Sequence, residues 1–356
     1  EQPGSGDYNR NFPPMAKSES GSFLLLNRNK ESLTLNLKSD SGREIFRRLA
    51  AGADVVLEGF RPGVMARLGL DYDALRKLNH RLVYCAISGF GQDGPYRLKP
   101  GHDLNYMALA GAVQLFGKAG GDPMVPGLSI ADVGGGSLMA VAGILGALIA
   151  RGTTDDGQMV DISMTDGSLA WLALHGAEHF FAGIEPRGGE RPFIGQAPCY
   201  NIYRCADGHH VALGIIEPHF WQRFCDHLGL ADLKQQQWPE AASAEDQFTR
   251  LAALFETRTR DAWLLEFEAV DIPFSAVNSM AEAFDDPQAR HRQMYLEMDH
   301  PVEGRIPQIG FPVKLSGTPC SLRRAPPLLG EHNHDILEAL GYGAAEIEHL
   351  EQTGVL

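Results

Sequence analysis

The fold is decided by residues 32–88, SLTLNLKSDSGREIFRRLAAGADVVLEGFRPGVMARLGLDYDALRKLNHRLVYCAIS. Short runs of β-forming residues alternate there with amphipathic stretches bounded by turn residues, a pattern typical of β-α-β units in a parallel sheet. Asp40 or Ser41 can cap the first helix and Gly52 can end it. We therefore predict an α/β fold with alternating elements at Ser32–Leu37, Ser41–Ala51, Asp54–Glu58, Pro62–Leu68, Tyr72–Leu78 and Leu82–Ser88.

The region before this stretch lacks the strand that should open a doubly wound sheet. Residues 1–31 are rich in Gly, Pro, Ser and Asn and contain no β-like run. We expect a first β-α-β unit to lie upstream of Glu1.

A Gly/Pro-rich linker offers the clearest domain boundary, at residues 183–198. Beyond it, short strands and amphipathic helices indicate a smaller α+β domain. A second Pro-punctuated connection precedes a terminal helix near His334. The predicted parts are a large domain (1–182), a linker (183–199), a small domain (200–290), a return linker (291–327) and a C-terminal helical segment packing back on the large domain (328–356).

Composition excludes several classes of protein. With 356 residues, 44% of them hydrophobic, the chain can bury a core, and a net charge of −14 argues against nucleic acid or an anionic membrane as partner. The apolar run Leu138–Ala150 falls short of the roughly 20 residues of a membrane span and predicts a buried helix. Five cysteines without a C-x-x-C pair fit neither a disulfide framework nor a zinc site. No leader follows Glu1, so we expect a cytoplasmic protein.

Charge is distributed unevenly along the chain. Residues 1–100 hold 15 basic and 11 acidic side chains, whereas the other 256 hold 16 basic and 34 acidic. The cluster is either an anion site or a solvated helix face. Its members are Arg28, Lys30, Lys38, Arg43, Arg47, Arg48, Arg61 and Arg67.

Two glycine-rich segments carry chemical interest. Gly89–Gly94 spells a dinucleotide fingerprint, but Pro95–Pro100 provides no helix to hold a pyrophosphate, so we predict a loop whose backbone is closely approached by a ligand.

Asp132 precedes three glycines at the start of the most apolar helix. Glycine disfavours helix there, which indicates that something approaches the backbone. Asp132 is either a helix cap or a catalytic residue beside N–H groups suited to an oxyanion.

Three further polar residues lie at element boundaries. His102 and Asp103 open a predicted helix and are, taken alone, a structural histidine and a cap. Glu217 ends an apolar strand and is, taken alone, a first-turn acid that the helix dipole favours. The remaining histidines lack metal-ligand spacing.

Taken together, the motifs resemble the family III CoA-transferase and racemase superfamily, from about residue 1 to the C-terminus. The resemblance implies a Rossmann-like CoA-binding domain, a smaller domain and a homodimer of interlocked ring-shaped subunits. In that family E-x-P-G-x-G-D follows the second strand, so Glu1–Asp7 implies a missing first unit. The motifs are Asn27–Lys30 (NRNK), Leu35–Ser39 (LNLKS), Glu58–Gly63 (EGFRPG), Ser88–Gln92 (SGFGQ), Gly101–Asp103 (GHD) and Gly330–His332 (GEH).

Two chemistries within the superfamily use the residue that matches Asp132. In formyl-CoA transferase-like members it is a nucleophile that carries acyl and CoA intermediates. In α-methylacyl-CoA racemase-like members it is paired with a His in G-H-D-x-N-Y and a Glu in I-E-P-x-F, matched here by Gly101–Tyr106 and Ile216–Phe220. The resemblance therefore favours a racemase with His102, Asp132 and Glu217 as catalytic residues. The alternatives are a CoA-transferase and a catalytically silent acyl-CoA-binding protein.

The chemistry of racemisation supports this pairing independently. Inverting a carbon α to a thioester requires a proton to leave one face and return to the other, so two acid/base groups flank the carbon. Reference pKa values of about 6.5 for His and 3.9 for Asp mean that burial must raise the pKa of Asp132. Glu217 would orient His102, and the enolate oxygen would rest on N–H groups over Asp132–Gly134.

The resemblance also implies the substrate contacts. CoA enters as part of an acyl-CoA substrate, and no separate cofactor and no metal is expected. Two departures from the racemase pattern, Gln2 and Gln196, affect one CoA contact and the acyl specificity. The residues expected to bind acyl-CoA are Arg28, Leu35, Asn36, Leu37, Lys38, Gly59, Arg61, Arg67, Gly101, Asp103, Asn105 and Tyr106.

Overall fold

The computed structural model describes residues 1–356, except for the side chains of residues 241 and 242. The chain forms two compact units, each assembled from separate chain segments. Unit 1 comprises Glu1–Cys85, Ile144–Val160 and Ser279–Leu356, and unit 2 comprises Ala86–Gly143 and Asp161–Asn278. The domain boundaries given by the linkers stay a prediction.

A parallel sheet with strand order β1-β2-β3 confirms the α/β class. Its strands are β1 (Val55–Glu58), β2 (Val83–Ser88) and β3 (Met159–Ser163). Strand β2 is almost continuously buried, as expected for a strand covered on both faces. The connecting helices are α2 (Asp40–Gly52), α3 (Val64–Leu68) and α4 (Tyr72–Leu75), close to their predicted positions.

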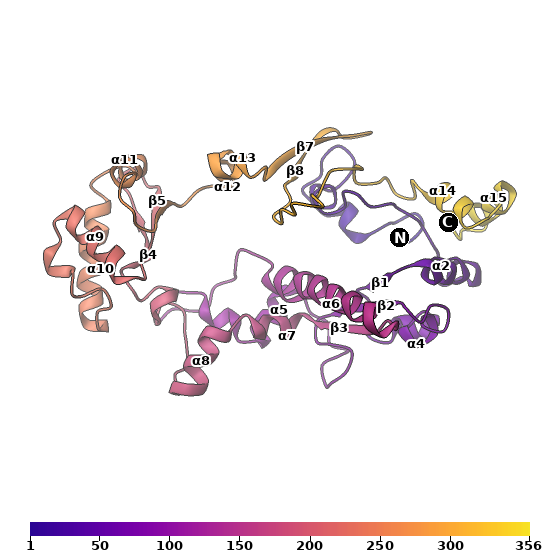
Figure 1. Cartoon of the computed structure of the whole chain (residues 1–356), viewed down its shortest axis with the longest axis horizontal. Helices are drawn as coiled ribbons and strands as arrows, with labels where there is room; N and C mark the ends of the chain where they lie inside the picture. The colour runs from indigo at the N-terminus through magenta and orange to yellow at the C-terminus, as the bar shows by residue number, and fades with distance from the viewer. The chain divides into compact units, whose positions relative to one another are not determined.

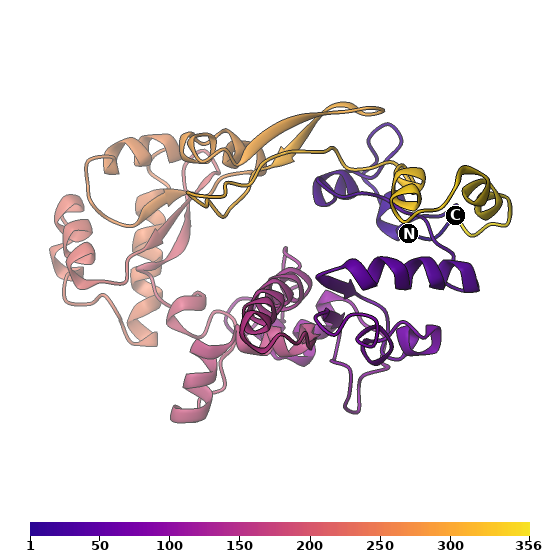
Figure 2. The same cartoon turned by 45° about the vertical axis from the view of Figure 1, so that its right-hand side comes forward.

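The strand predicted at Ser32–Leu37 is wrong. The segment is extended but belongs to no sheet, and its backbone bonds reach the two ends of the chain. Leu35 N–H donates to Glu1 O at 2.8 Å, and Asn36 N–H donates to Val355 O at 2.8 Å. Leu35 is buried with Ile45 of α2 and apolar residues of the C-terminal helices α14 (Asn333–Ala339) and α15 (Ala344–Gln352). Figure 2 shows these C-terminal helices, in yellow, near the N-terminus of the chain.

The predicted return linker contains an antiparallel hairpin, β7 (Tyr295–His300) and β8 (Gly304–Ile309). Glu303 lies in the turn between β7 and β8. Its carboxylate accepts hydrogen bonds from the N–H groups of Lys17, Ser18 and Glu19 and from the Ser18 hydroxyl. Burial alone would raise the pKa of Glu303, but these bonds lower it to about 2. The preceding helices are α12 (Met280–Asp285) and α13 (Pro287–His291), and near the N-terminus lie η1 (Tyr8–Asn11) and α1 (Gly21–Leu26).

The part of unit 2 after the linker has the predicted mixture of strands and helices. Strands β4 (Tyr200–Arg204), β5 (His210–Gly214) and β6 (Phe274–Ala276) form an antiparallel sheet. Aromatic side chains dominate its core, including Trp221, Phe255 and Trp263. The helices are α9 (Pro218–Leu228), η5 (Ala231–Leu233), α10 (Ala241–Phe255) and α11 (Arg260–Phe267), and η4 (Pro192–Ile194) lies in the linker.

The rest of unit 2 is helical and holds the candidate site residues His102 and Asp132. A π-helix, η3, runs directly into α6, and α5 and α7 lie side by side in Figure 1. Helices α7 and α8 are separated by Trp171 and Leu172. The bounds are α5 (Asp103–Leu109), η2 (Ala112–Leu115), η3 (Ile130–Leu138), α6 (Met139–Thr154), α7 (Met164–Ala170) and α8 (Ala173–Ala182).

The short buried helix predicted at Leu138–Ala150 is longer and more exposed than expected. Because the glycine-rich segment is helical too, Ile130–Thr154 forms 25 continuous residues of mean hydropathy 2.0 in their most apolar window. By length and composition this helix could cross a membrane, and 28% of that window is buried. Val141, Leu145 and Ile149 are each more than half exposed. The core helix of a soluble protein meets the same two criteria, and the η3 portion packs against α7.

The glycines in η3 are explained in part by its packing against α7, because the backbones of the two helices touch where they cross. A Cβ on Gly135 would lie 2.6 Å from Met164 O, and a Cβ on Gly167 would lie 2.3 Å from Gly135 O. No side chain fits at such a crossing. The predicted close approach to the backbone is therefore made, at Gly135, by a neighbouring helix.

We predict that Gly135→Ala destabilises the protein by about 1–3 kcal/mol, because the new methyl group forces backbone apart. Gly176→Ala is the matched control: its Cβ would meet the Phe180 ring at an ordinary 3.5 Å. That change should be neutral or stabilising by up to about 1 kcal/mol. Thermal and urea unfolding of both variants measure the difference, and equal stability of the two would contradict the crossing.

Candidate active site

His102 is held at the start of α5 by its own motif. Its N–H donates to Asn105 Oδ1 at 3.1 Å, and its carbonyl accepts from Asn105 N–H at 2.8 Å. His102 is the N-cap residue of α5, and it is exposed. The motif therefore fixes the backbone of His102 and leaves the imidazole accessible.

The side chain of Tyr106 explains why positions 89 and 101 are glycines. Its hydroxyl donates to Gly101 O at 2.5 Å, and its ring packs edge-on against Phe90. A Cβ on Gly89 or Gly101 would lie 2.3 or 2.6 Å from that ring. The loop predicted to admit a ligand at Gly89 is instead approached by the Tyr106 side chain.

Asp132 lies in the first turn of η3 and is tied to α5. Its N–H donates to Asp103 Oδ1 at 2.9 Å, and its carbonyl accepts from Ser137 Oγ at 3.0 Å. The N-cap residue of η3 is Ser129, so the prediction of Asp132 as the helix cap is wrong. A π-helix is rare, and such turns occur frequently at functional sites.

The surroundings of Asp132 change its acidity. Partial burial raises the pKa of Asp132, the like charge of Asp103 raises it further, and His102 acts in the opposite direction. The structure links the two predicted residues through their neighbour: Asp103, which follows His102 at the start of α5, accepts the hydrogen bond from Asp132 N–H on η3.

The expected oxyanion donors are only partly available. Asp132 N–H is bonded to Asp103, and Val133 N–H donates to Ser129 O at 3.1 Å. Each of these two N–H groups already has a protein acceptor, so of the expected set over Asp132–Gly134 neither is free for an enolate oxygen in this arrangement. The use of this helix start for an enolate stays a prediction.

Glu217 is placed apart from this pair. It is the N-cap residue of α9, ahead of Pro218, and its side chain makes no capping bond. Its carbonyl accepts from Phe220 and Trp221 N–H at 3.2 Å. Among the described residues, no hydrogen bond or ion pair joins Glu217 to His102 or Asp132.

In unit 1, the predicted CoA-binding residues have different environments. Lys38, Arg61 and Arg67 are exposed near the starts or ends of α2 and α3. Leu35 is part of the core and offers a ligand little beyond its backbone. The remaining members are Asn36, whose Oδ1 accepts from Lys38 N–H at 3.1 Å, the partly buried Leu37 and the exposed Gly59.

In the sequence, Glu58 stands out only as the first residue of the EGFRPG motif, and the structure places it at the end of β1. Glu58 is buried, and its Oε2 accepts from Phe60 N–H at 2.6 Å, within the loop that carries Arg61. Burial raises the pKa of Glu58, while the bond from Phe60 lowers it. A glutamate at a strand end looks like any solvated acid in the sequence, so only its position within the structure reveals this role.

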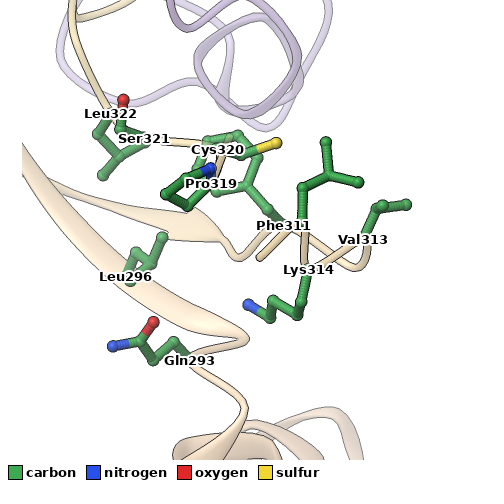
Figure 3. Close-up of a pocket in the computed structure, with 10 residues that line it drawn as sticks. Gln293, Leu296, Phe311, Val313, Lys314, Pro319, Cys320, Ser321 and Leu322 are labelled. Atoms are coloured by element: carbon green, nitrogen blue, oxygen red, sulfur yellow. The ribbon is translucent and has the colours of Figure 1, made fainter. Parts of the chain in front are cut away.

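Arg28 lies beside a pocket that the sequence did not predict. Its Nη1 donates to Ile309 O and, at 3.3 Å, to Gln308 Oε1, and its guanidinium lies 4.3 Å from the Phe311 ring centroid. Phe311, Lys314 and eight other residues line this cavity of about 290 Å³ in unit 1 (Figure 3). The Arg28 guanidinium is therefore bound to residues at the end of β8 and to the Phe311 ring that follows.

No group of three or more His, Cys, Asp or Glu side chains is arranged to hold a metal ion in the part of the chain that the structure describes. The acid and base groups gathered at the candidate site are His102, Asp103 and Asp132.

Comparison with known proteins gives a consistent result. Residues 1–333 match the model of CoA-transferase family III. An acyl-CoA transferase of Fusarium pseudograminearum is 35% identical over 343 residues, covering 94% of this chain and 74% of that protein. The human α-methylacyl-CoA racemase is 34% identical over 334 residues (93% and 86%), and the human succinyl-CoA:glutarate CoA-transferase is 31% identical over 363 residues (100% and 82%). The crystal structure of a CAIB/BAIF family protein from Brucella suis aligns with a TM-score of 0.82 at 30% identity, covering 96% and 90%.

We predict that Asp103→Asn lowers the pKa of Asp132. The amide oxygen can still accept from Asp132 N–H, but the like charge that opposes ionisation of Asp132 is gone. A carboxyl ¹³C NMR titration of Asp132 measures the shift. Asp161→Asn, which removes a carboxylate that accepts from Gln92 N–H instead, is the control and should leave the pKa of Asp132 unchanged. An unchanged pKa in Asp103→Asn would show that the two carboxylates do not interact.

Proposed function

The chain belongs to CoA-transferase family III, and from that premise we propose that it is an acyl-CoA racemase of the α-methylacyl type. The reaction is a 1,1-proton transfer at the carbon α to a CoA thioester. The observation that carries the proposal is the pairing of His102 with Asp132, whose pKa burial and Asp103 raise. Relatives with both racemase and transferase names match the chain, so the reaction has to be argued from the site.

The proposed mechanism assigns one face of the substrate to each residue. In one direction His102 takes the α proton, the electron pair moves into the thioester to form an enolate, and protonated Asp132 returns a proton to the opposite face. In the other direction the carboxylate of Asp132 is the base and the imidazolium of His102 is the acid. Because the pKa of Asp132 is raised, it lies closer to the pKa of an imidazole. The shared proton can then be held by either residue.

A CoA-transferase that uses Asp132 as a nucleophile is the second candidate. It is favoured by the transferase names of relatives at similar identity. Attack on a thioester needs an ionised carboxylate, whereas a proton carrier must exist in both protonation states. Burial and Asp103 raise the pKa of Asp132, which is the direction that helps a proton carrier. A silent acyl-CoA-binding protein is a lesser alternative.

We further propose a homodimer in which Glu217 of the partner subunit orients His102. Glu217 makes no capping bond on α9, so its carboxylate is available to another group. A helix face of α6 with exposed Val141, Leu145 and Ile149 supports association with a further surface. An orienting carboxylate would fix the imidazole tautomer and raise its basicity.

The reaction class predicts deuterium incorporation. In D₂O, one pure enantiomer of an α-methylacyl-CoA should exchange its α hydrogen and lose optical purity without any added acceptor acid. Asp132→Asn and His102→Ala should each abolish racemisation, as measured by mass spectrometry and chiral chromatography. Transfer of CoA to an added carboxylic acid, with no exchange, would replace the racemase by the transferase.

The basic cluster predicts a binding defect. Replacing Arg61 or Lys38 by Ala should weaken the binding of free CoA by about 1–3 kcal/mol, the range for a charge-assisted contact. Arg292→Ala, at another exposed arginine of unit 1, is the control and should leave binding unchanged. Calorimetric titration decides between the two interpretations: unchanged affinity in both variants would mean that the cluster is a solvated face.

A further inference from the structure

Unit 2 contains an apolar cavity of about 470 Å³, a size within the usual range of small-molecule pockets. We call it the acyl cavity. Its walls come from α5, η2, the start of η3 and the break between α7 and α8. The lining residues used below are Met107, Leu115, Ile130, Trp171, Leu172 and His175.

The acyl cavity shares its walls with the candidate site. Met107 belongs to α5, the helix that begins directly after His102, and Ile130 lies two residues before Asp132 on η3. Trp171 also contacts the catalytic segment, because a Cβ on Gly134 would lie 3.2 Å from its Nε1. A chain attached to a carbon between His102 and Asp132 therefore has an apolar cavity beside it.

The charge of the cavity restricts what it can hold. Within the described part of the chain, its lining contains no Lys, Arg, Asp or Glu. His175 is the one ionisable residue among these lining residues, and its Nδ1 lies 3.2 Å from Glu178 Oε2. The other oxygen of Glu178 accepts from Arg191 at 2.6 Å, so the nearby cation is already paired. A carboxylate entering this space would lie against apolar side chains in place of part of its hydration shell, and it would find no free cation among these lining residues.

We propose that the acyl cavity binds the acyl chain of the substrate and selects aliphatic α-methylacyl groups over acyl groups that carry a second carboxylate. The proposal rests on the proposed function. The proposed substrate differs from those of relatives named for succinate and glutarate, because a succinyl or glutaryl group ends in a carboxylate. Leu115 and Leu172 set the apolar character of the cavity, and Trp171 forms the wall between it and Gly134.

Tryptophan fluorescence tests the binding without requiring turnover. Of the four tryptophans, Trp171 lines the cavity, whereas Trp221 and Trp263 are buried in another core. Binding of 2-methylhexanoyl-CoA should change the emission, free CoA should not, and Trp171→Phe should remove the change. No acyl-dependent change overturns the proposal, even if racemisation occurs. A Trp171-dependent change without deuterium exchange supports the cavity and overturns the racemase.

A charge placed in the cavity tests the selectivity. Leu115→Lys should lower kcat/KM for 2-methylhexanoyl-CoA relative to 2-methylsuccinyl-CoA at least tenfold, because the new cation favours the second carboxylate. Leu109→Lys, on an exposed position of α5 outside the lining, is the matched control and should leave that ratio within twofold. A ratio that does not move in Leu115→Lys overturns the proposal. If that variant does not fold, Leu172→Arg takes its place with the same criterion.

Discussion

The arrangement of the candidate site depends on one hydrogen bond, from Asp132 N–H to the carboxylate of Asp103. It joins the first turn of η3 to the first turn of α5, and so it fixes Asp132 relative to His102. Burial raises the pKa of Asp132, and the bond adds to this because it places the carboxylate of Asp103 close by. The same contact therefore fixes the geometry of the site and contributes to its acidity, and it occupies one N–H group that an oxyanion could have used.

The position of η3, which carries Asp132, is also set by its packing against α7. Gly135 and Gly167 meet there at backbone distance, so no side chain separates the two helices. A larger residue at either position would push η3 away from α7, and η3 is the element that reaches α5 through Asp132. Gly135 and Gly167 thus help to position Asp132 by allowing the helices to pack closely, without contacting the substrate themselves.

The sequence predicts the parts of the molecule that depend on local pattern. Strands β1 and β2 and helix α2 follow from alternation within a few residues, although the N-cap of α2 is Ser39 and not the predicted Asp40 or Ser41. The error at Ser32–Leu37 has a different origin, since its partners Glu1 and Val355 lie at the chain ends and no local pattern contains them. In the site, His102 and Asp132 could be predicted from motifs, whereas the bond between Asp103 and Asp132 could not. That bond depends on the packing of two helices that are separated by more than 20 residues in the chain.

Family membership alone leaves the reaction open, because racemisation and CoA transfer place the same demands on most of the fold. Both need a bound thioester and a carboxyl group at the position of Asp132. They differ in the protonation state that this carboxyl must hold when the substrate arrives: a nucleophile must be ionised, and a proton carrier must exist in both forms. Burial and Asp103 raise the pKa of Asp132, and the lining of the acyl cavity contains no Lys or Arg that could pair with a second carboxylate of an acyl group. These two features are independent, since one concerns the acid and the other the chain attached to the reacting carbon, and both favour proton transfer on an aliphatic thioester.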